Sequence, residues 1–105
     1  MFYLVSYSEE YISLAIHANS ASKEDCQKTM KELVIADIQA KYGHDINMAE
    51  LIYNSAKNAV SADDEDAVFS QYGVNVHVYE DGASFDDGYY MNKYQIIDYT
   101  SGQCE

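Results

Sequence analysis

The chain has 105 residues, of which 48% are hydrophobic, so it is long and apolar enough to form one domain with its own core. Eighteen acidic residues and six lysines, with no arginine, give a net charge of −12, and we expect residues 1–105 to form a single domain. Because the lysines are scattered along the sequence and phosphate binding requires clustered cations, this composition argues against nucleic acids and anionic membranes as direct partners.

The N-terminal sequence predicts no export. No basic residue precedes the apolar residues 2–5, and Glu9-Glu10 follow them, so the segment does not resemble a signal peptide. No stretch approaches the roughly 18 apolar residues of a membrane-spanning helix. Cys26 and Cys104 fit no metal-binding or redox spacing. We therefore expect a cytoplasmic protein with free thiols.

Two strands are predicted at the start of the chain, over residues 2–7 and 11–18. The loop of residues 8–10 is short enough to join them as a hairpin. Apolar and polar residues alternate through the second segment, as in a strand with one buried face. The residues expected on the buried face are Ile12, Leu14, Ile16 and Ala18. In this register Phe2 and Leu4 share that face.

A helix is predicted over residues 23–41. Ser22 and Asp25 before it resemble a capping box, and Gly43 is a suitable stop signal after it. Apolar residues spaced three and four apart indicate one buried stripe. These residues are Cys26, Met30, Leu33, Val34 and Ile38.

A second helix is expected to begin after Asp45 or Asn47. Its apolar stripe consists of Met48, Leu51, Ile52, Ala56, Ala59 and Val60. Residues 61–66 are polar and acidic, and we expect a break there. Residues 67–69 fit either a helical turn or a short strand, and the sequence does not decide between them.

The C-terminal part of the chain predicts further strands. Residues 74–79 alternate between valines and polar or aromatic residues, as in a half-buried strand. Asp81-Gly82 is a strong turn signal, which either closes a hairpin onto residues 83–85 or forms a bulge in one longer strand. Residues 94–99 form the last predicted strand. Its adjacent Ile96 and Ile97 suggest a central position with both faces covered.

The predicted order ββααββ(β) indicates an α+β fold, with an antiparallel β-sheet of four or five strands and two α-helices packed on one face. The residues expected to be buried are Leu14, Ile16, Leu33, Val34, Leu51, Val76 and Ile96. The other face of the sheet stays exposed. It is expected to carry Tyr3, Tyr7, Tyr11, Ser13, His17, Asn75, His77 and Tyr79.

No arrangement of residues predicts catalysis. His17 and His77 could share the exposed sheet face and bind zinc with a carboxylate, but ordinary strand histidines are the commoner explanation of this pattern. Cys26 falls on the buried helix stripe and is expected in the core. No glycine-rich phosphate loop occurs, and no nucleophile is paired with a base. We therefore expect a non-enzyme with no cofactor and no metal.

Negative charge is concentrated in the C-terminal half, where residues 58–105 contain ten carboxylates and one base, Lys93. Residues 63–66 are the densest acidic run, but consecutive acids without a central glycine do not match a calcium loop. Residues 79–90 place four acids and four aromatic residues around two predicted turns. Carboxylates accept paired hydrogen bonds from basic residues, and aromatic rings supply rigid contact area. The candidate partner-binding residues are Asp63, Asp64, Glu65, Asp66, Tyr79, Glu80, Asp81, Phe85, Asp86, Asp87, Tyr89 and Tyr90.

Several features occur together in one loose class of proteins. A tyrosine-bearing strand pair precedes a serine-capped helix (Ser22-Lys23-Glu24-Asp25), and an aspartate-rich turn (Asp86-Asp87-Gly88) precedes the strand Tyr94-Gln95-Ile96-Ile97-Asp98. In these features residues 1–42 and 70–99 resemble small acidic proteins of phages and mobile elements. The chain is similar in size and charge to anti-CRISPR inhibitors, which often occupy the basic nucleic-acid groove of a nuclease. The resemblance implies action in the cytoplasm of a phage's host cell.

Two functional hypotheses follow. In the first, the protein is an anti-CRISPR-like inhibitor whose acids mimic nucleic acid and block a basic surface of a nuclease or other defence protein. This hypothesis requires the acids of residues 63–66, 80–81 and 86–87 to meet on one face. In the second, the protein is an accessory or self-associating domain, such as a homodimer, that binds through its tyrosine-rich sheet face or a sheet edge without mimicry.

Overall fold

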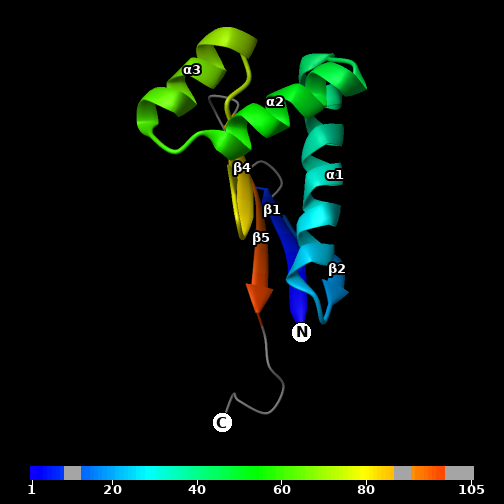
Figure 1. Ribbon diagram of the computed structural model, residues 1–105. Helices are drawn as coiled ribbons and strands as arrows, with labels where there is room; N and C mark the ends of the chain where they lie inside the picture. The colour runs from blue at the N-terminus through cyan, green and yellow to red at the C-terminus, as the bar shows by residue number, and fades with distance from the viewer. Residues whose placement is uncertain (9–12, 87–90, 99–105) are drawn as a thin grey trace.

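The computed structural model describes residues 1–8, 13–86 and 91–98 (Figure 1). The chain forms an α+β fold with a five-stranded antiparallel sheet and three helices. In chain order the elements are β1 (Phe2–Ser8), β2 (Ser13–Ser20), α1 (Lys23–Tyr42), α2 (Ile46–Asn58), α3 (Ala62–Tyr72), β3 (Val76–Tyr79), β4 (Gly82–Asp86) and β5 (Met91–Asp98). Some residues of the sequence-based predictions lie outside the described part, namely Tyr11, Ile12, Asp87, Gly88, Tyr89, Tyr90, Tyr99 and Cys104. The same holds for the side chains of Ser13, Leu14 and Asp86.

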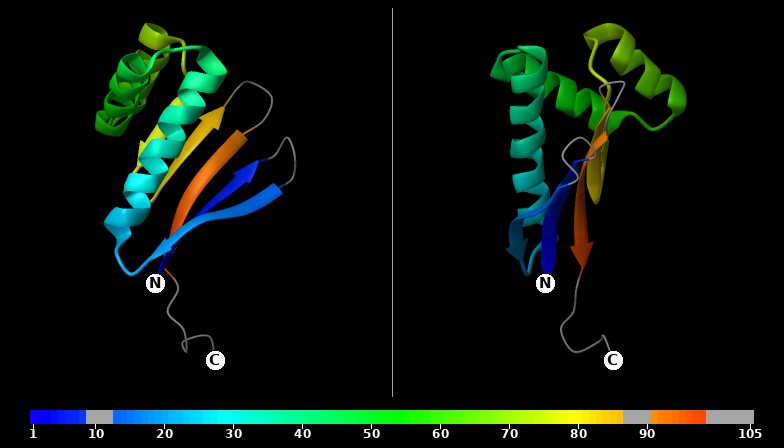
Figure 2. Two further views of the ribbon diagram at one scale, coloured as in Figure 1. Left: turned by 90° about the vertical axis from the view of Figure 1, so that its right-hand side faces the viewer. Right: turned by 180° about the vertical axis from the view of Figure 1, so that it is seen from behind.

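The strands follow the order β2-β1-β5-β4-β3, and each strand is antiparallel to its neighbours. The expected antiparallel sheet is therefore confirmed, with the larger of the two predicted strand numbers. β5 lies in the centre, where Ile96 pairs with Leu4 of β1 and Gln95 pairs with Gly82 of β4. Figure 2 shows α1 running across one face of this sheet. None of the helices in the described part is long and apolar enough to cross a membrane.

Helix α1 has the predicted bounds to within one residue. Its side chains at four-residue spacing, Cys26, Met30, Val34 and Ile38, are fully buried against the sheet, as a helix with one apolar face requires. The predicted capping box is wrong, because the Ser22 hydroxyl donates to Glu24 at 2.8 Å and makes no cap hydrogen bond to the backbone.

Helix α3 corrects two predictions, namely two helices in all and a break over residues 61–66. Ser61 caps α3, because its hydroxyl accepts a hydrogen bond from the Asp64 N–H at 3.2 Å. The Asp64 carboxylate accepts one from the Val60 N–H, also at 3.2 Å. Acids in the first turn also stabilise the positive end of a helix dipole. The acidic run therefore begins a helix, which continues through residues 67–69.

Helix α2 lies between the helices α1 and α3. Asp45 caps it by accepting a hydrogen bond from the Met48 N–H at 2.8 Å. α2 packs on α1 and on β3, and α3 packs on α2. In Figures 1 and 2, α3 lies on the other side of β3 from α1. The sheet therefore has one face covered by α1 and α2, and most of the other face is left open.

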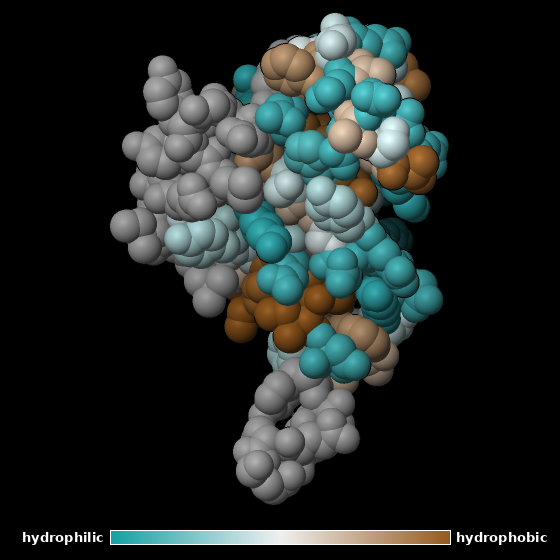
Figure 3. Space-filling view, turned by 90° about the vertical axis from the view of Figure 1, so that its left-hand side faces the viewer, coloured by the Kyte–Doolittle hydropathy of each residue, from teal (hydrophilic) through white to brown (hydrophobic). Residues whose placement is uncertain are grey.

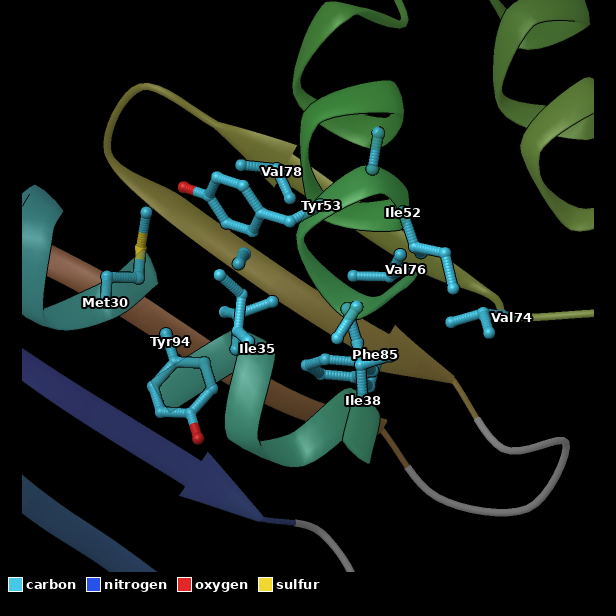
Figure 4. Close-up of a cluster of buried hydrophobic side chains, with 14 of the residues drawn as sticks. Met30, Ile35, Ile38, Ile52, Tyr53, Val74, Val76, Val78, Phe85 and Tyr94 are labelled. Atoms are coloured by element: carbon cyan, nitrogen blue, oxygen red, sulfur yellow. The ribbon is translucent and has the colours of Figure 1, made fainter. Parts of the chain in front are cut away.

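The core lies between the sheet and the helices α1 and α2 (Figure 4). Val34, Val76 and Ile96 are buried as predicted, and Leu33 is only partly buried at its margin. Leu51 was expected inside but is exposed. The residues of α2 that face the core are Ala49, Ile52, Tyr53 and Ala56. Leu51 lies on a different side of this helix, so that prediction is wrong.

A bulge in the first hairpin overturns the expected burial of Ile16. Leu4 pairs with Ala18, but the next residue, Val5, pairs with Ile16, so His17 is an extra residue in β2. An extra residue shifts the alternation of a strand by one position, so the side chains on the two sides of the bulge no longer follow one alternating pattern. Ile16 is consequently 67% exposed, on the face that α1 and α2 do not cover.

The turn signal at Asp81-Gly82 does close a hairpin, and the alternative of a bulge in one long strand is wrong. Tyr79 pairs with Gly82, so the two turn residues are Glu80 and Asp81. Gly82 itself lies in β4 against the backbone of β5. A Cβ atom at this position would be 2.9 Å from the carbonyl oxygen of Tyr94, so the close packing of these strands requires glycine.

Candidate protein-binding surfaces

The acids of α3 are only in part available to a partner. Asp63, Asp64 and Asp66 are all exposed, but the Asp64 carboxylate accepts a hydrogen bond from the Val60 N–H before the helix. The Glu65 carboxylate lies 3.4 Å from Nδ1 of His77, and Nε2 of the same ring is 3.1 Å from the Asn75 side-chain oxygen. Two of the four predicted contact residues in this run therefore have structural roles.

The β3–β4 turn is attached to the rest of the molecule. The Glu80 carboxylate pairs with Lys23 of α1 at 3.3 Å, and the Glu80 carbonyl accepts a hydrogen bond from the Gln27 side chain at 2.8 Å. The Asp81 carbonyl accepts one from the Ile96 N–H at 2.8 Å. Tyr79 at the end of β3 is exposed, as predicted. The backbone of this turn is fixed, with the exposed side chains on its outside.

Phe85 is the predicted contact residue that the structure contradicts. It is 1% exposed and packs in the core, because it alternates along β4 with Ser84 and faces the same side as Ala83. Asp87, Tyr89 and Tyr90 lie outside the described residues, as does the Asp86 side chain.

The two described groups of acids lie apart in the fold. Figures 1 and 2 show the β3–β4 turn at the opposite end of the hairpin from the connection to α3. Glu65 lies beside His77 of β3, and Glu80 is paired with Lys23 of α1. The described acids therefore form two separate groups. This placement argues against charge mimicry by a single acidic face.

The uncovered side of the sheet carries an apolar surface, which we call the open face and define by Val5, Tyr7, Ile16 and Ile97. The register places these side chains on one side of β1, β2 and β5. The strand order confirms the predicted central position of β5. The expected cover on both of its faces is wrong, because Ile97 is 42% exposed. Figure 3 shows apolar side chains gathered on this side of the sheet, below α3.

The open face holds part of the residue set predicted for it. Tyr3 and Tyr7 of β1 lie on this side, as do His77 and Tyr79 of β3. His17 does not, because the bulge turns it toward α1. The sequence missed Val5, Ile16 and Ile97, and the adjacent Ile96 and Ile97 were the one signal that both faces of β5 are apolar.

His17 belongs to a small polar cluster on the helix side. Its Nε2 is 2.6 Å from the Ser6 hydroxyl, and its ring centroid is 5.8 Å from that of Tyr94. The Tyr94 hydroxyl donates to the Asp37 carboxylate of α1. Burial, together with this hydrogen bond and the charge of Asp37, raises the pKa of Tyr94. The cluster links the bulge to the helix.

A zinc site shared by His17 and His77 is excluded by the strand order. Their strands, β2 and β3, are the two edges of the sheet, four strand spacings apart or about 19 Å. Within the described ranges no three His, Cys, Asp or Glu side chains come together as a metal site would need. Cys26 is a buried free thiol, as predicted, and burial raises its pKa.

Three of the six lysines come together in space. Lys28, Lys31 and Lys57 line one groove between α1, α2 and the β3–β4 turn. The sequence did contain a partial signal, because Lys28 and Lys31 are three residues apart on a predicted helix and so lie on the same side. Lys57 reaches the groove from α2, and this could be found only from the packing of the two helices.

Comparison with known proteins assigns no family to the chain. No protein-family model matches it, and no curated protein or solved structure does so either. The functional interpretation therefore depends on the surfaces described above.

Proposed function

We propose that this protein is a small acidic protein-binding domain that engages a basic protein through the open face. The observation that carries the proposal is the exposure of Ile16 of β2 and Ile97 of β5, with exposed Tyr7 and half-buried Val5 on β1 between these strands. Leaving an aliphatic side chain in water forgoes about 1.5–3 kcal/mol relative to burial. Apolar patches with tyrosine are typical of the centre of protein interfaces.

The net charge of −12 supports a basic partner. A second copy of the chain would bring the same charge to the interface, and like charges oppose such an association. A basic partner would instead be attracted over a distance, with faster association. The exposed acids Asp63, Asp66 and Asp81 would then lie around the contact and attract the partner without providing its centre.

Proteins that bind nucleic acids are the class of partner with the required positive surface. We therefore propose an inhibitor or accessory protein of the anti-CRISPR type, in which the bound domain obstructs a basic surface of a nuclease or other defence protein. The proposal rests on charge and on the open face, and it requires no catalytic residue.

Direct mimicry of nucleic acid by the acids is the second candidate. Its support is that Asp63 and Asp66 project from α3 without an ion pair in the described part of the structure. In this case the acids would form the centre of the contact and the open face would be dispensable. Separate substitution of the two surfaces distinguishes the two candidates.

The experiment uses three variants of the full chain. Ile16→Thr with Ile97→Thr makes the open face polar, and Asp63→Asn with Asp66→Asn and Asp81→Asn removes exposed acids. Val60→Thr with Leu51→Gln is the control, because it removes exposed apolar groups elsewhere. Proteins retained from a host-cell extract by each immobilised variant are quantified by mass spectrometry, and the affinity of the purified partner is then measured at low and moderate salt.

We expect the open-face variant to lose the partner, the acid variant to bind more slowly with a flatter salt dependence, and the control to bind normally. Equal retention by the open-face variant and the unmodified chain would overturn the proposal. If only the acid variant lost the partner, the mimicry candidate would replace it. A concentration-dependent dimer in sedimentation equilibrium, abolished by the open-face substitutions, would also overturn it and identify a second copy as the occupant.

A further inference from the structure

A groove of about 480 Å³ lies between α1, α2 and the β3–β4 turn, on the side of the sheet away from the open face. Three of the six lysines of the chain, Lys28, Lys31 and Lys57, line it together with Tyr53 and Tyr79. We call it the lysine groove. Its volume lies in the range of small-molecule sites, roughly 300–1,000 Å³.

The groove is a local concentration of positive charge in a strongly acidic protein. Glu80 is the one acid that lines it, and its carboxylate is paired with Lys23. Lys31 has a weak pair with Glu50 at 4.0 Å. Lys28 and Lys57 form no ion pair within the described residues. Three cations around one groove repel one another unless an anion lies between them.

Tyr53 contributes a second, independent observation. It is 4% exposed, but its hydroxyl is not among the buried polar atoms that lack a partner, so the hydroxyl reaches the surface. A tyrosine combines an apolar ring with a hydroxyl that can donate a hydrogen bond to a ligand. Figure 4 shows the Tyr53 ring between Met30 and Val78, with the hydroxyl pointing away from α2. Because Met30 and Val78 also line the groove, the hydroxyl is available to a ligand there.

The lining also indicates the shape of the ligand. Met30 and Val78 are apolar and form a buried floor, and the Tyr53 ring lies beside them. Flat apolar ligands pack well on such surfaces, and a ring can stack on tyrosine. Lysine ammonium groups bind phosphate or carboxylate as point charges. The Lys31 ammonium lies over the Tyr53 ring, 5.7 Å from the ring centre.

We infer that the lysine groove binds a small planar aromatic anion, a ring that carries a phosphate or a carboxylate group. The ring lies on the floor of Met30 and Val78, beside the Tyr53 ring. The anionic group is held by Lys28 and Lys57, with Lys31 and the Tyr53 hydroxyl as further donors. This site lies apart from the open face and does not depend on the proposed protein partner.

The test is a titration of isotope-labelled full-length protein followed by amide NMR shifts, with four probes. Adenosine 5′-monophosphate carries a ring and a phosphate, and 2-naphthoate carries a ring and a carboxylate. Adenosine and inorganic phosphate each supply one of the two features. We expect shifts around Gln27–Lys31, Tyr53 and Lys57 with one or both aromatic anions, and binding at least about fivefold weaker for adenosine and phosphate.

Three variants locate the binding. Lys28→Gln with Lys57→Gln should weaken binding of the aromatic anion by about tenfold, and Tyr53→Phe, which keeps the ring, by about fivefold. Lys41→Gln is the control, because Lys41 does not line the groove and its removal makes the net charge more negative by one unit, against two for the double variant. Its affinity should stay within about twofold of the unmodified chain.

The outcomes separate the inference from simple charge attraction. Binding of the phosphate or of the carboxylate probe supports the site and identifies which anion it prefers. Inorganic phosphate that binds as tightly as both aromatic anions would overturn it, and so would an equal loss in Lys41→Gln and the double variant. Absence of shifts in the groove with all four probes would overturn it too. Circular dichroism of each variant shows that the fold is retained, and Tyr53→Phe tests the site without a change of charge.

Discussion

Val5 and Ile16 lie directly opposite each other across β1 and β2, on the face of the sheet that α1 and α2 do not cover. One residue earlier in β1, Leu4 faces the core and is fully buried opposite Ala18. A single extra residue, His17, therefore decides whether an isoleucine supports the core or lies on the surface. The same bulge directs His17 to Ser6 and Tyr94, which fixes the shifted register from the helix side.

The bulge predicts different energetic roles for two isoleucines. Ile96→Ala empties a buried position and should lower the free energy of unfolding by roughly 2–5 kcal/mol. Ile16→Ala removes an exposed side chain and should change it by less than about 1 kcal/mol. Urea unfolding followed by circular dichroism measures both. Similar losses in the two variants would show that the hairpin has the unbulged register.

The cap of α3 predicts that Ser61→Ala lowers stability. The substitution removes the acceptor for the Asp64 N–H and should cost about 1 kcal/mol. Ser70→Ala is the control, since Ser70 is exposed within the same helix and alanine favours a helix interior. Helix content by circular dichroism and urea unfolding are the measurements. A loss from Ser70→Ala as large as that from Ser61→Ala would contradict the capping role.

Gly82 predicts a steric penalty. In Gly82→Ala the new methyl group would be 2.9 Å from the Tyr94 carbonyl oxygen, so β4 and β5 would have to move apart. We expect a loss of about 1–3 kcal/mol in the free energy of unfolding. Ser84→Ala, two residues along the same strand, should change it by no more than about 0.5 kcal/mol. Unimpaired stability of Gly82→Ala would mean that these two strands pack more loosely than described.

Tyr94 predicts a dependence of stability on alkaline pH. Its raised pKa means that the folded protein holds the phenol proton more tightly than the unfolded chain, in which tyrosine titrates near pH 10. This stabilisation is therefore complete below about pH 10 and is lost as the pH rises toward the pKa of the folded state. Tyr94→Phe should reduce the slope of unfolding free energy against pH above about 10 by up to about 1.4 kcal/mol per pH unit.

The control for this pH dependence is Tyr79→Phe, which removes an exposed hydroxyl. Unfolding free energies are measured for the unmodified chain and both variants between neutral and alkaline pH. Tyr79→Phe should keep the slope of the unmodified chain. A Tyr94→Phe profile parallel to that of the unmodified chain would show that the Tyr94 hydroxyl does not titrate differently on folding.

Local periodicity was enough to predict the main elements. The stripe from Cys26 to Ile38 located α1, and the valines of residues 74–79 located β3, because these patterns report directly which side chains face the core. The sequence does not predict α3, although Ser61 and Asp64 have the spacing of a cap, because a run of acids is also typical of a solvated loop. A charged first turn is compatible with a helix when the charge is negative.

The surfaces depended on information that no local pattern contains. The alternation of residues 11–18 is regular in the sequence, so nothing there signals the bulge at His17. The acids of residues 63–66 and 80–81 are near one another in sequence order, but α3 and the hairpin separate them. The lysine groove combines α1 with α2, and the open face combines three strands. Each required the packing of elements that are distant in the chain.

The pairing of β1 with β5 has a consequence for synthesis of the chain. Leu4 of β1 cannot meet Ile96 of β5 until almost the whole sequence has been made. At about 5–20 residues per second, the first hairpin waits several seconds with one edge of β1 unpaired. An unpaired strand edge is a template for pairing with another chain. The acids of residues 58–105, which carry most of the negative charge, are made last, so they repel neighbouring copies only when β5 itself becomes available to cover that edge.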